Sequence, residues 1–242
     1  MPTTDAPASA LAVYAHPDDG EISAGGTLAR WARAGAQVWV LITTRGDKGT
    51  TDPDADLDAL VRQRLDETAA AAERLGFAGH LHFDYPDGEL PGDRELSERI
   101  TRSVRELRPE VVLCPDPTAV FLGDSYVNHR DHRLTGWAVL DAVSTAASNP
   151  HYFPEHLADG LAVHQVGAVY LSGTLEPNCW VDISETIEAK IDALFLHRSQ
   201  LTETGGEAGE WFRTFLRAGA EDAGRAAGLA YAEAFRRITF SS

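Results

Sequence analysis

Cysteine is scarce in this chain of 242 residues, which contains only Cys114 and Cys179. Because the two residues lie far apart in apolar stretches, a disulfide framework is excluded, and we expect buried free thiols in a reducing compartment. Long hydrophobic runs are absent too: no stretch approaches the roughly 18 apolar residues of a membrane helix, and the first residues lack a basic start and an apolar core. These absences predict a cytoplasmic protein without a membrane span.

Positive charge is also in short supply. Lysine and arginine total 21 residues against 37 aspartates and glutamates, which gives a formal net charge of −16. A nucleic-acid partner would require a basic face to neutralise its phosphates, and an anionic membrane would repel an acidic protein. The composition therefore argues against both kinds of partner.

The chain does contain a regular alternation of short apolar runs and longer amphipathic segments. The predicted strands cover residues 11–15, 37–42, 80–83, 110–114, 168–172 and 179–183, and the predicted helices cover 22–34, 59–75, 93–107, 134–147, 184–197 and 224–238. This alternation is typical of right-handed βαβ units. It predicts an α/β fold with a Rossmann-like, mostly parallel β-sheet and helices on both faces.

No linker rich in proline, glycine or serine interrupts the pattern, and 43% of the residues are hydrophobic, which is enough for a sizeable core. We therefore expect a single domain over residues 1–242. Within it, residues 1–9 are expected to form a loose N-terminal tail. Residues 149–164, which contain two prolines, are expected to form an irregular insertion.

Metal-ligand side chains gather after two of the predicted strands. The first cluster follows the strand at 11–15, and the second lies in the long loop after the strand at 110–114. They comprise His16, Asp18, Asp19 and Glu21, and then His129, Asp131 and His132. Ligands bind beyond the carboxyl ends of strands in α/β folds. Two imidazoles and one carboxylate on one ion leave positions open, which suits Zn²⁺ in hydrolysis or Fe²⁺ in oxygen chemistry.

Three classes of function fit this cluster: a metal hydrolase, a non-haem iron oxygenase, and a metal-dependent binding protein without activity. Adjacent residues in a turn do not readily bind the same ion, so Asp18 beside Asp19 is free to act as a base. The spare imidazole is either His129 or His132. This surplus of acid and base groups favours hydrolysis.

Several motifs resemble the PIG-L/LmbE family of zinc-dependent N-deacetylases. The specific ones are Ala15-His16-Pro17-Asp18-Asp19 with Gly25-Gly26-Thr27, and the downstream His129-x-Asp131-His132; weaker matches are Arg64-x-x-Glu67, the turn at Asp87, His197-x-Ser199-Gln200 and Ala232-Glu233-Ala234-Phe235. The resemblance covers nearly the whole chain. It implies hydrolysis of an N-acetyl group on an N-acetylglucosamine-like sugar or a related small metabolite. A mycothiol-type S-conjugate amidase with the same metal chemistry is the alternative.

The resemblance also implies a role for individual residues. It makes His16, Asp19 and His132 the ligands of Zn²⁺, with another divalent metal such as Fe²⁺ as the alternative. It makes Asp18 the general base and His129 the oxyanion-stabilising group, with Asp131 orienting the ring of His129; Arg64 and Asp87 match sugar-binding positions. The chain departs from some relatives in having Val127 where they have tyrosine, with Tyr126 one residue earlier. Homo-oligomerisation stays open.

Other aromatic and basic residues have structural interpretations. Trp31, Trp39, Trp137 and Trp180 lie on apolar faces and are expected in the core, whereas Trp211 is the aromatic candidate for stacking on a sugar. Arg64 and Glu67 lie three residues apart on a predicted helix and could also form a plain ion pair. His80 and His82 alternate on a predicted strand and are expected to have a structural role or to lie on the surface.

Overall fold

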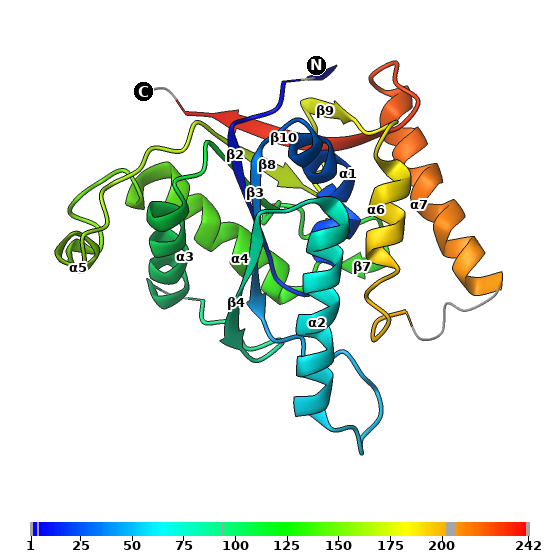
Figure 1. The fold of residues 1–242 in the computed structure, drawn as a ribbon, viewed down its shortest axis with the longest axis horizontal. Coiled ribbons are helices and arrows are strands. Elements are labelled where there is room, and N and C mark those ends of the chain that lie inside the picture. Colours follow the sequence, from blue (N-terminus) through cyan, green and yellow to red (C-terminus); the bar gives the residue numbers. More distant parts are fainter. Residues whose placement is uncertain (1, 4, 93, 202–206, 241–242) are drawn as a thin grey trace.

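The structure, a computed structural model, describes residues 2–3, 5–92, 94–201 and 207–240. An eight-stranded sheet in the order β1-β9-β10-β8-β5-β2-β3-β4 forms its centre (Figure 1). Its strands are β1 (Pro2–Thr3), β2 (Ser9–Tyr14), β3 (Gln37–Thr44), β4 (Gly79–Tyr85), β5 (Val111–Pro115), β8 (Ala168–Ser172), β9 (Cys179–Asp182) and β10 (Ala232–Thr239). A separate hairpin consists of β6 (Phe121–Leu122) and β7 (Tyr126–Val127).

Helices cover both faces of this sheet (Figure 1). One layer consists of α1 (Asp19–Arg33), α2 (Leu57–Leu75), α6 (Ile187–Leu194) and α7 (Glu207–Arg225). The other consists of α3 (Arg94–Leu107) and α4 (Arg130–Asp141), which continues into a π-helical turn, η1 (Ala142–Ala146); the short α5 (Pro154–Ala158) packs beyond α3. None of the helices among these residues is long and apolar enough to cross a bilayer.

Alternating side chains of the central strands build two cores. On β2, Ala10, Ala12 and Tyr14 pack with α1, whereas Leu11 and Val13 pack with α3 and α4. A strand whose two faces are both covered by helices is apolar throughout, which explains the continuous hydrophobic runs in the sequence. Fully burying one such leucine or valine stabilises the fold by about 1.5–3 kcal/mol.

The order of the strands reverses at β2. After β2 the chain adds β3 and β4 on one side, and it then returns to place β5 and β8 on the other. Such a reversal opens a crevice beyond the carboxyl ends of β2 and β5, where α/β proteins bind their ligands. The predicted fold class is confirmed, with β10 as an antiparallel strand between β8 and β9.

The end of the chain corrects the sequence analysis. Residues 224–238 were expected to form a helix, but residues 232–239 form β10, which pairs with both β8 and β9. The run from Ala232 to Phe235 is rich in alanine and glutamate, which favour helices, but pairing on both edges overrides local propensity. The helix of this region is α7, which the sequence analysis missed.

The N-terminal tail is also corrected. Pro2–Thr3 adds to the sheet edge beside β9 and Ser9 already belongs to β2, so residues 1–9 are not a loose tail throughout. Proline is tolerated there because an edge strand leaves one side unpaired. We keep the single-domain organisation over 1–242 as a proposal, which is supported by one sheet that takes strands from both ends of the chain.

Candidate active site

The first predicted cluster lies in the turn between β2 and α1. The backbone N–H of His16 donates to Oδ2 of Asp19 at 2.8 Å, which closes the turn. Asp18 occupies the N-cap position of α1 with φ 93° and ψ −27°, in the left-handed region that is uncommon for a residue other than glycine. Backbone outliers of this kind cluster at functional sites. The turn thereby brings two adjacent carboxylates to the crevice at the carboxyl end of β2.

Three donor atoms meet at this crevice. Nδ1 of His16 lies 3.3 Å from Oδ2 of Asp19 and 3.3 Å from Nε2 of His132, and Nε2 of His132 lies 3.1 Å from the same oxygen. Ligand atoms bonded to a tetrahedral ion at about 2.0–2.1 Å lie about 3.3 Å apart. We name these three atoms the metal triangle, because one small divalent cation fits all three.

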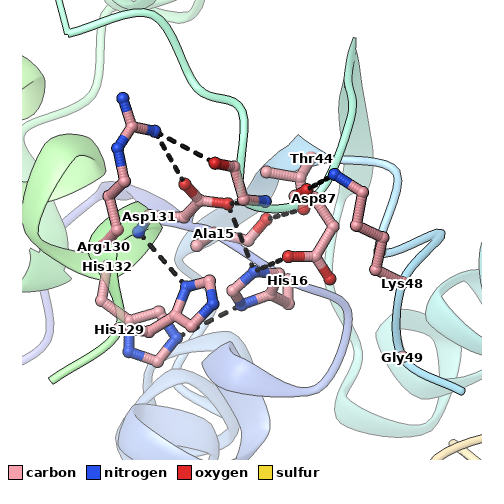
Figure 2. Close-up of polar contacts among 12 residues, drawn as sticks. Ala15, His16, Thr44, Lys48, Gly49, Asp87, His129, Arg130, Asp131 and His132 are labelled. Atoms are coloured by element: carbon pink, nitrogen blue, oxygen red, sulfur yellow. Dashed lines mark hydrogen bonds and ion pairs between the residues drawn. The ribbon is translucent and has the colours of Figure 1, made fainter. Parts of the chain in front are cut away.

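The outer nitrogen of each ring in the metal triangle is held by an oxygen. Nε2 of His16 lies 3.2 Å from Oδ1 of Asp87, and Nδ1 of His132 lies 3.0 Å from Oδ1 of Asn128 (Figure 2 shows the His16 contact). The Asn128 amide N–H₂ donates to the carbonyl of Ala119, which orients its oxygen toward His132. Because both oxygens accept, each ring carries a proton on its outer nitrogen, so the inner nitrogen of the neutral ring is the one that can bind an ion.

His129 and Asp131 lie beside the metal triangle, at the start of α4. Nδ1 of His129 accepts from the backbone N–H of Asp131 at 3.2 Å, so the neutral ring carries its proton on Nε2. The carboxylate of Asp131, which the resemblance placed on His129, lies 3.6 Å from Nε2 of His16 and accepts from the backbone N–H of Gly88 (Figure 2). Asp131 thus contacts the ring of His129 through its backbone, a difference from the expectation.

Carboxylates dominate the electrostatics of the cluster. Burial opposes a charged ring at His16, but the carboxylates of Asp131, Asp19 and Asp87 raise the pKa of His16 to about 12. Burial opposes ionisation of Asp19, yet the His132 and His16 rings hold its pKa far below the ordinary value. An imidazole that binds a proton so tightly marks a surplus of negative charge, and a divalent cation would compete for the same position.

Asp18 and His129 differ from the residues of the metal triangle. Burial, followed by the neighbouring Asp19 carboxylate, raises the pKa of Asp18 to about 7. Burial and the ring of His16 lower the pKa of His129. Neither residue contributes an atom to the metal triangle, although His129 also belongs to a second, looser group of possible ligands with His16, Asp87 and Asp131.

A cavity of about 260 Å³ lies over the metal triangle. The predicted residues Asp18, Arg64, Asp87 and His129 line it, together with Gly49, Tyr126 and Gln200. The guanidinium of Arg64 is buried and donates to the carbonyls of Gly46 and Gly49. A Cβ at position 49 would overlap the guanidinium, so a glycine fits there. Arg64 therefore shapes the wall of the cavity through the loop after β3.

Glu67 bonds to other residues instead of forming the ion pair with Arg64 that the sequence analysis considered. Glu67 accepts from the backbone N–H of Ser199 at 2.9 Å, from its hydroxyl at 2.6 Å, and from Gln63. These bonds anchor the segment that carries Gln200 to the cavity wall. His197 is fully buried nearby, with Nε2 at 3.5 Å from Oε2 of Glu21.

Other sequence candidates lie outside this cavity. Trp211 is exposed on α7 and stacks on Phe215, away from the cavity lining. Trp137, expected in the core, is 49% exposed on α4, so that expectation was wrong. The sequence analysis also assigned no role to Asn128. Its spacing of four residues from His132 could have indicated a contact between the two side chains, but only if the helix was known to begin at residue 130. Cys114 and Cys179 are buried and free, as predicted.

Comparison with known proteins gives one family. The PIG-L family model, described as GlcNAc-PI de-N-acetylase, matches residues 11–143, which include both clusters. A diacetylchitobiose deacetylase from Thermococcus kodakarensis is 37% identical over 228 residues, covering 94% of this chain and 82% of the relative. A 1D-myo-inositol 2-acetamido-2-deoxy-alpha-D-glucopyranoside deacetylase from Kineococcus radiotolerans is 34% identical over 197 residues; the match covers 69% of this chain and about half of that relative (52%).

The fold is also found among solved structures. The N,N'-diacetylchitobiose deacetylase from Pyrococcus horikoshii superimposes with a TM-score of 0.87 and 32% sequence identity. The match covers 96% of this chain and 84% of that chain. Sequence and structure thus point to the same set of relatives.

Proposed function

The chain belongs to the PIG-L family of N-deacetylases, and from this premise we propose that it removes the acetyl group from the nitrogen of an N-acetylglucosamine-like sugar with a zinc ion held by His16, Asp19 and His132. The metal triangle carries this proposal. Two ring nitrogens and one carboxylate oxygen converge there at the spacing of one tetrahedral face, which supports an ion among them. Fe²⁺ is the alternative ion, since the same ligand types suit it.

The ligands are prepared for a cation by their surroundings. Asp87 and Asn128 orient the two rings, so that little reorganisation is needed when an ion binds. A bound zinc ion supplies Lewis acidity, which lowers the pKa of water toward about 7 and polarises a carbonyl oxygen. The protein's own residues then have to move protons and hold the amide.

Asp18 is the general base in this proposal. It lines the cavity next to the metal triangle but contributes no atom to it, so its carboxylate is available for a proton from the attacking water. The attack makes a tetrahedral carbon and places negative charge on the former carbonyl oxygen. Breaking the C–N bond then requires a proton on the nitrogen. It comes from Asp18, which took it from the water, or from His129 in its doubly protonated form, which then recovers a proton from Asp18.

His129 stabilises the oxyanion. With Nδ1 occupied by the N–H of Asp131, the ring has its proton on Nε2, and it lines the same cavity as Asp18. A donor aimed at developing negative charge contributes more in a dry cavity than in water. Removing one such donor slows acyl transfer by about 10²–10³-fold.

The cavity suits one sugar unit. At about 260 Å³ it is slightly smaller than typical small-molecule sites, which measure about 300–1,000 Å³. In this proposal Arg64 and Asp87, which line the cavity, hold the sugar hydroxyls, and the half-exposed ring of Tyr126 lies at the cavity wall. Any further part of the substrate would extend beyond this cavity. The proposed substrate is therefore a small molecule. The proposed compartment is the cytoplasm, where both free thiols stay reduced.

The test is release of the amine. Zinc-loaded protein is incubated with N-acetylglucosamine, N,N'-diacetylchitobiose and an inositol-linked N-acetylglucosaminide, and the freed amine is measured with fluorescamine and the acetate enzymatically. We expect equal amounts of both products, loss of activity with a chelator, and recovery with Zn²⁺. A chelator-resistant rate would remove the metal from the reaction, and no product from any of the three sugars would overturn the substrate class.

A further inference from the structure

A second cavity, of about 480 Å³, lies on the sheet face covered by α3 and α4. It is larger than the cavity over the metal triangle and shares no lining residue with it. Its sides are α3, α4, the π-helical turn η1 and the segment that enters α5. The proposed reaction uses none of these residues, so the cavity requires its own explanation.

Two backbone irregularities border this second cavity. The chain continues α4 into the π-helical turn, in which the N–H of Ala147 donates to the carbonyl of Ala142, five residues back. Phe153 has φ 53° and ψ 60°, a left-handed conformation that is costly for a bulky residue. π-Helical turns and strained residues are both frequent at functional sites. Their occurrence on one cavity suggests that its shape is maintained for a purpose.

A buried guanidinium holds the wall of the second cavity in place. Arg105 donates to the carbonyls of Ala146, Tyr152 and Phe153, at 2.9, 3.0 and 3.2 Å, and to two further carbonyls between them. It also contacts Nδ1 of the buried His156. This clamp fixes the backbone of three residues that line the cavity, so binding there would require little additional ordering.

The lining of the second cavity is amphipathic. Leu96, Ala138 and Phe153 form a buried apolar floor, and Arg94 lies 4.9 Å above the ring of Phe153. Trp137 and Tyr152, 49% and 47% exposed, rise on different elements around this floor. Exposed hydroxyls of Ser144 and Thr145 and the carboxylate of Asp141 complete the rim. Aromatic faces ringed by polar groups match a ligand with one apolar face and a polar edge.

We propose that the second cavity binds a pyranose unit of an amino-sugar saccharide. A pyranose ring places C–H groups on its face, which suit Trp137 and Tyr152, and hydroxyls at its edge, which suit the rim. The amino group of a deacetylated sugar is cationic and complements Asp141 and the acidic protein as a whole. The choice of an amino sugar rests on the proposed function, whereas the match to a ring with an apolar face and a polar edge rests on the lining of the cavity itself.

Binding is tested by NMR on the zinc-loaded, ¹⁵N-labelled full chain. The glucosamine disaccharide is the probe, because it has no acetyl group to lose. The indole N–H signal of Trp137, assigned from its absence in Trp137→Phe, is expected to shift saturably, while that of Trp211 stays in place as an exposed tryptophan outside the cavity. Tyr152→Ala is expected to raise the Kd about tenfold and to leave the rate of acetate release within about twofold of that of the unchanged protein.

Cellobiose, the same type of disaccharide without amino groups, is the second arm. We expect about tenfold weaker binding of cellobiose, and an equal loss for the glucosamine disaccharide in Asp141→Asn. Equal affinity of both sugars for the unchanged protein would overturn the amino-sugar assignment. An unmoved Trp137 signal, or one that moves with protein concentration alone because copies of the chain meet there, would overturn the saccharide site. Absence of acetate release with Trp137 binding intact would count against the proposed function only.

Discussion

Two clusters of buried charge in this protein differ in one respect, the balance of their charges. In the metal triangle and its surroundings, Asp19, Asp87 and Asp131 lie against the ring of His16, and Asp19 also contacts His132, so carboxylates outnumber fixed positive groups. The other cluster joins Glu233 of β10 to Lys190 of α6. Its carboxylate accepts from Nζ of Lys190 at 2.6 Å and from the backbone N–H groups of Gly26 and Thr27 at 3.0 and 2.7 Å.

The difference distinguishes the proposed metal site from a structural contact. The Lys190–Glu233 pair is neutral as a whole and ties α1, α6 and β10 together, while Gly26 has no room for a Cβ beside Ile183. The metal triangle is incomplete in charge, which a cation would correct. Residues of both clusters, Glu233 and Gly26 among them, belong to motifs through which the sequence resembles the PIG-L family, so motif membership alone does not distinguish function from stability.

Removing a ligand should have the largest effect. In His132→Ala the metal triangle keeps two of its three atoms, so we expect metal content near zero after dialysis and acetate release lower by about 10⁴-fold or more. Metal is measured by elemental analysis of the dialysed protein. Full zinc occupancy in this variant would assign the third ligand to another residue, with His129 of the second ligand group first to be tested.

Breaking the Lys190–Glu233 pair should affect stability but not metal binding. Lys190→Met leaves the Glu233 carboxylate buried without its cation, which costs about 3–5 kcal/mol of unfolding free energy in urea titrations. The double variant Lys190→Met/Glu233→Gln is expected to recover much of that loss. Metal content per folded molecule should be unchanged in both. A loss below about 1 kcal/mol for the single variant would show that the two backbone donors alone satisfy Glu233.

Loss of an outer contact sharpens the comparison at the metal triangle. Asn128→Ala removes the acceptor on Nδ1 of His132, and we expect zinc affinity to fall about 10–100-fold, as measured by competition with a chromophoric chelator. Asn128→Asp keeps an acceptor oxygen and should retain most of the affinity. If Asn128→Ala bound zinc as tightly as the unchanged protein, the orientation of the His132 ring would not depend on this amide.

A half-buried imidazole without a counter-charge should give the smallest effect. Burial, followed by the neighbouring His80, lowers the pKa of His82 from 6.5 to about 4. Between these values the unfolded chain binds a proton that the folded chain does not, so stability falls as the pH drops from about 6.5 to about 4, by no more than about 3 kcal/mol. His82→Leu should lose less stability over this range in pH-dependent urea titrations. An unchanged pH dependence would exclude His82 as its source.

The sequence was sufficient to place the three proposed metal ligands on one edge of the sheet. His16 and Asp19 follow one buried strand and His132 follows another, and the carboxyl ends of parallel strands share an edge. The role of Asn128 was hidden because the helix was expected to begin at residue 134. It begins at Arg130, capped by His129, an unusual residue for that position. Only this start places Asn128 next to the ring of His132.

Long-range pairing accounts for the other misreadings. Residues 232–239 have the composition of a helix, and only the two neighbouring strands make them a strand. Trp137 lies in an apolar-looking stretch of α4, but the second cavity leaves it half exposed. Glu67 was read with Arg64 because they share a helix, while its partner Ser199 lies 132 residues away in the chain. Local patterns do not contain such distances.

Anomalous diffraction at the zinc edge, from crystals grown with Zn²⁺, tests most directly whether the charge imbalance marks a metal site. A single peak is expected about 2.0–2.1 Å from Nδ1 of His16, Oδ2 of Asp19 and Nε2 of His132, with Asp18 outside bonding distance. A peak held instead by Asp87, His129 and Asp131, or no peak at all in the crevice beyond β2 and β5, would contradict it.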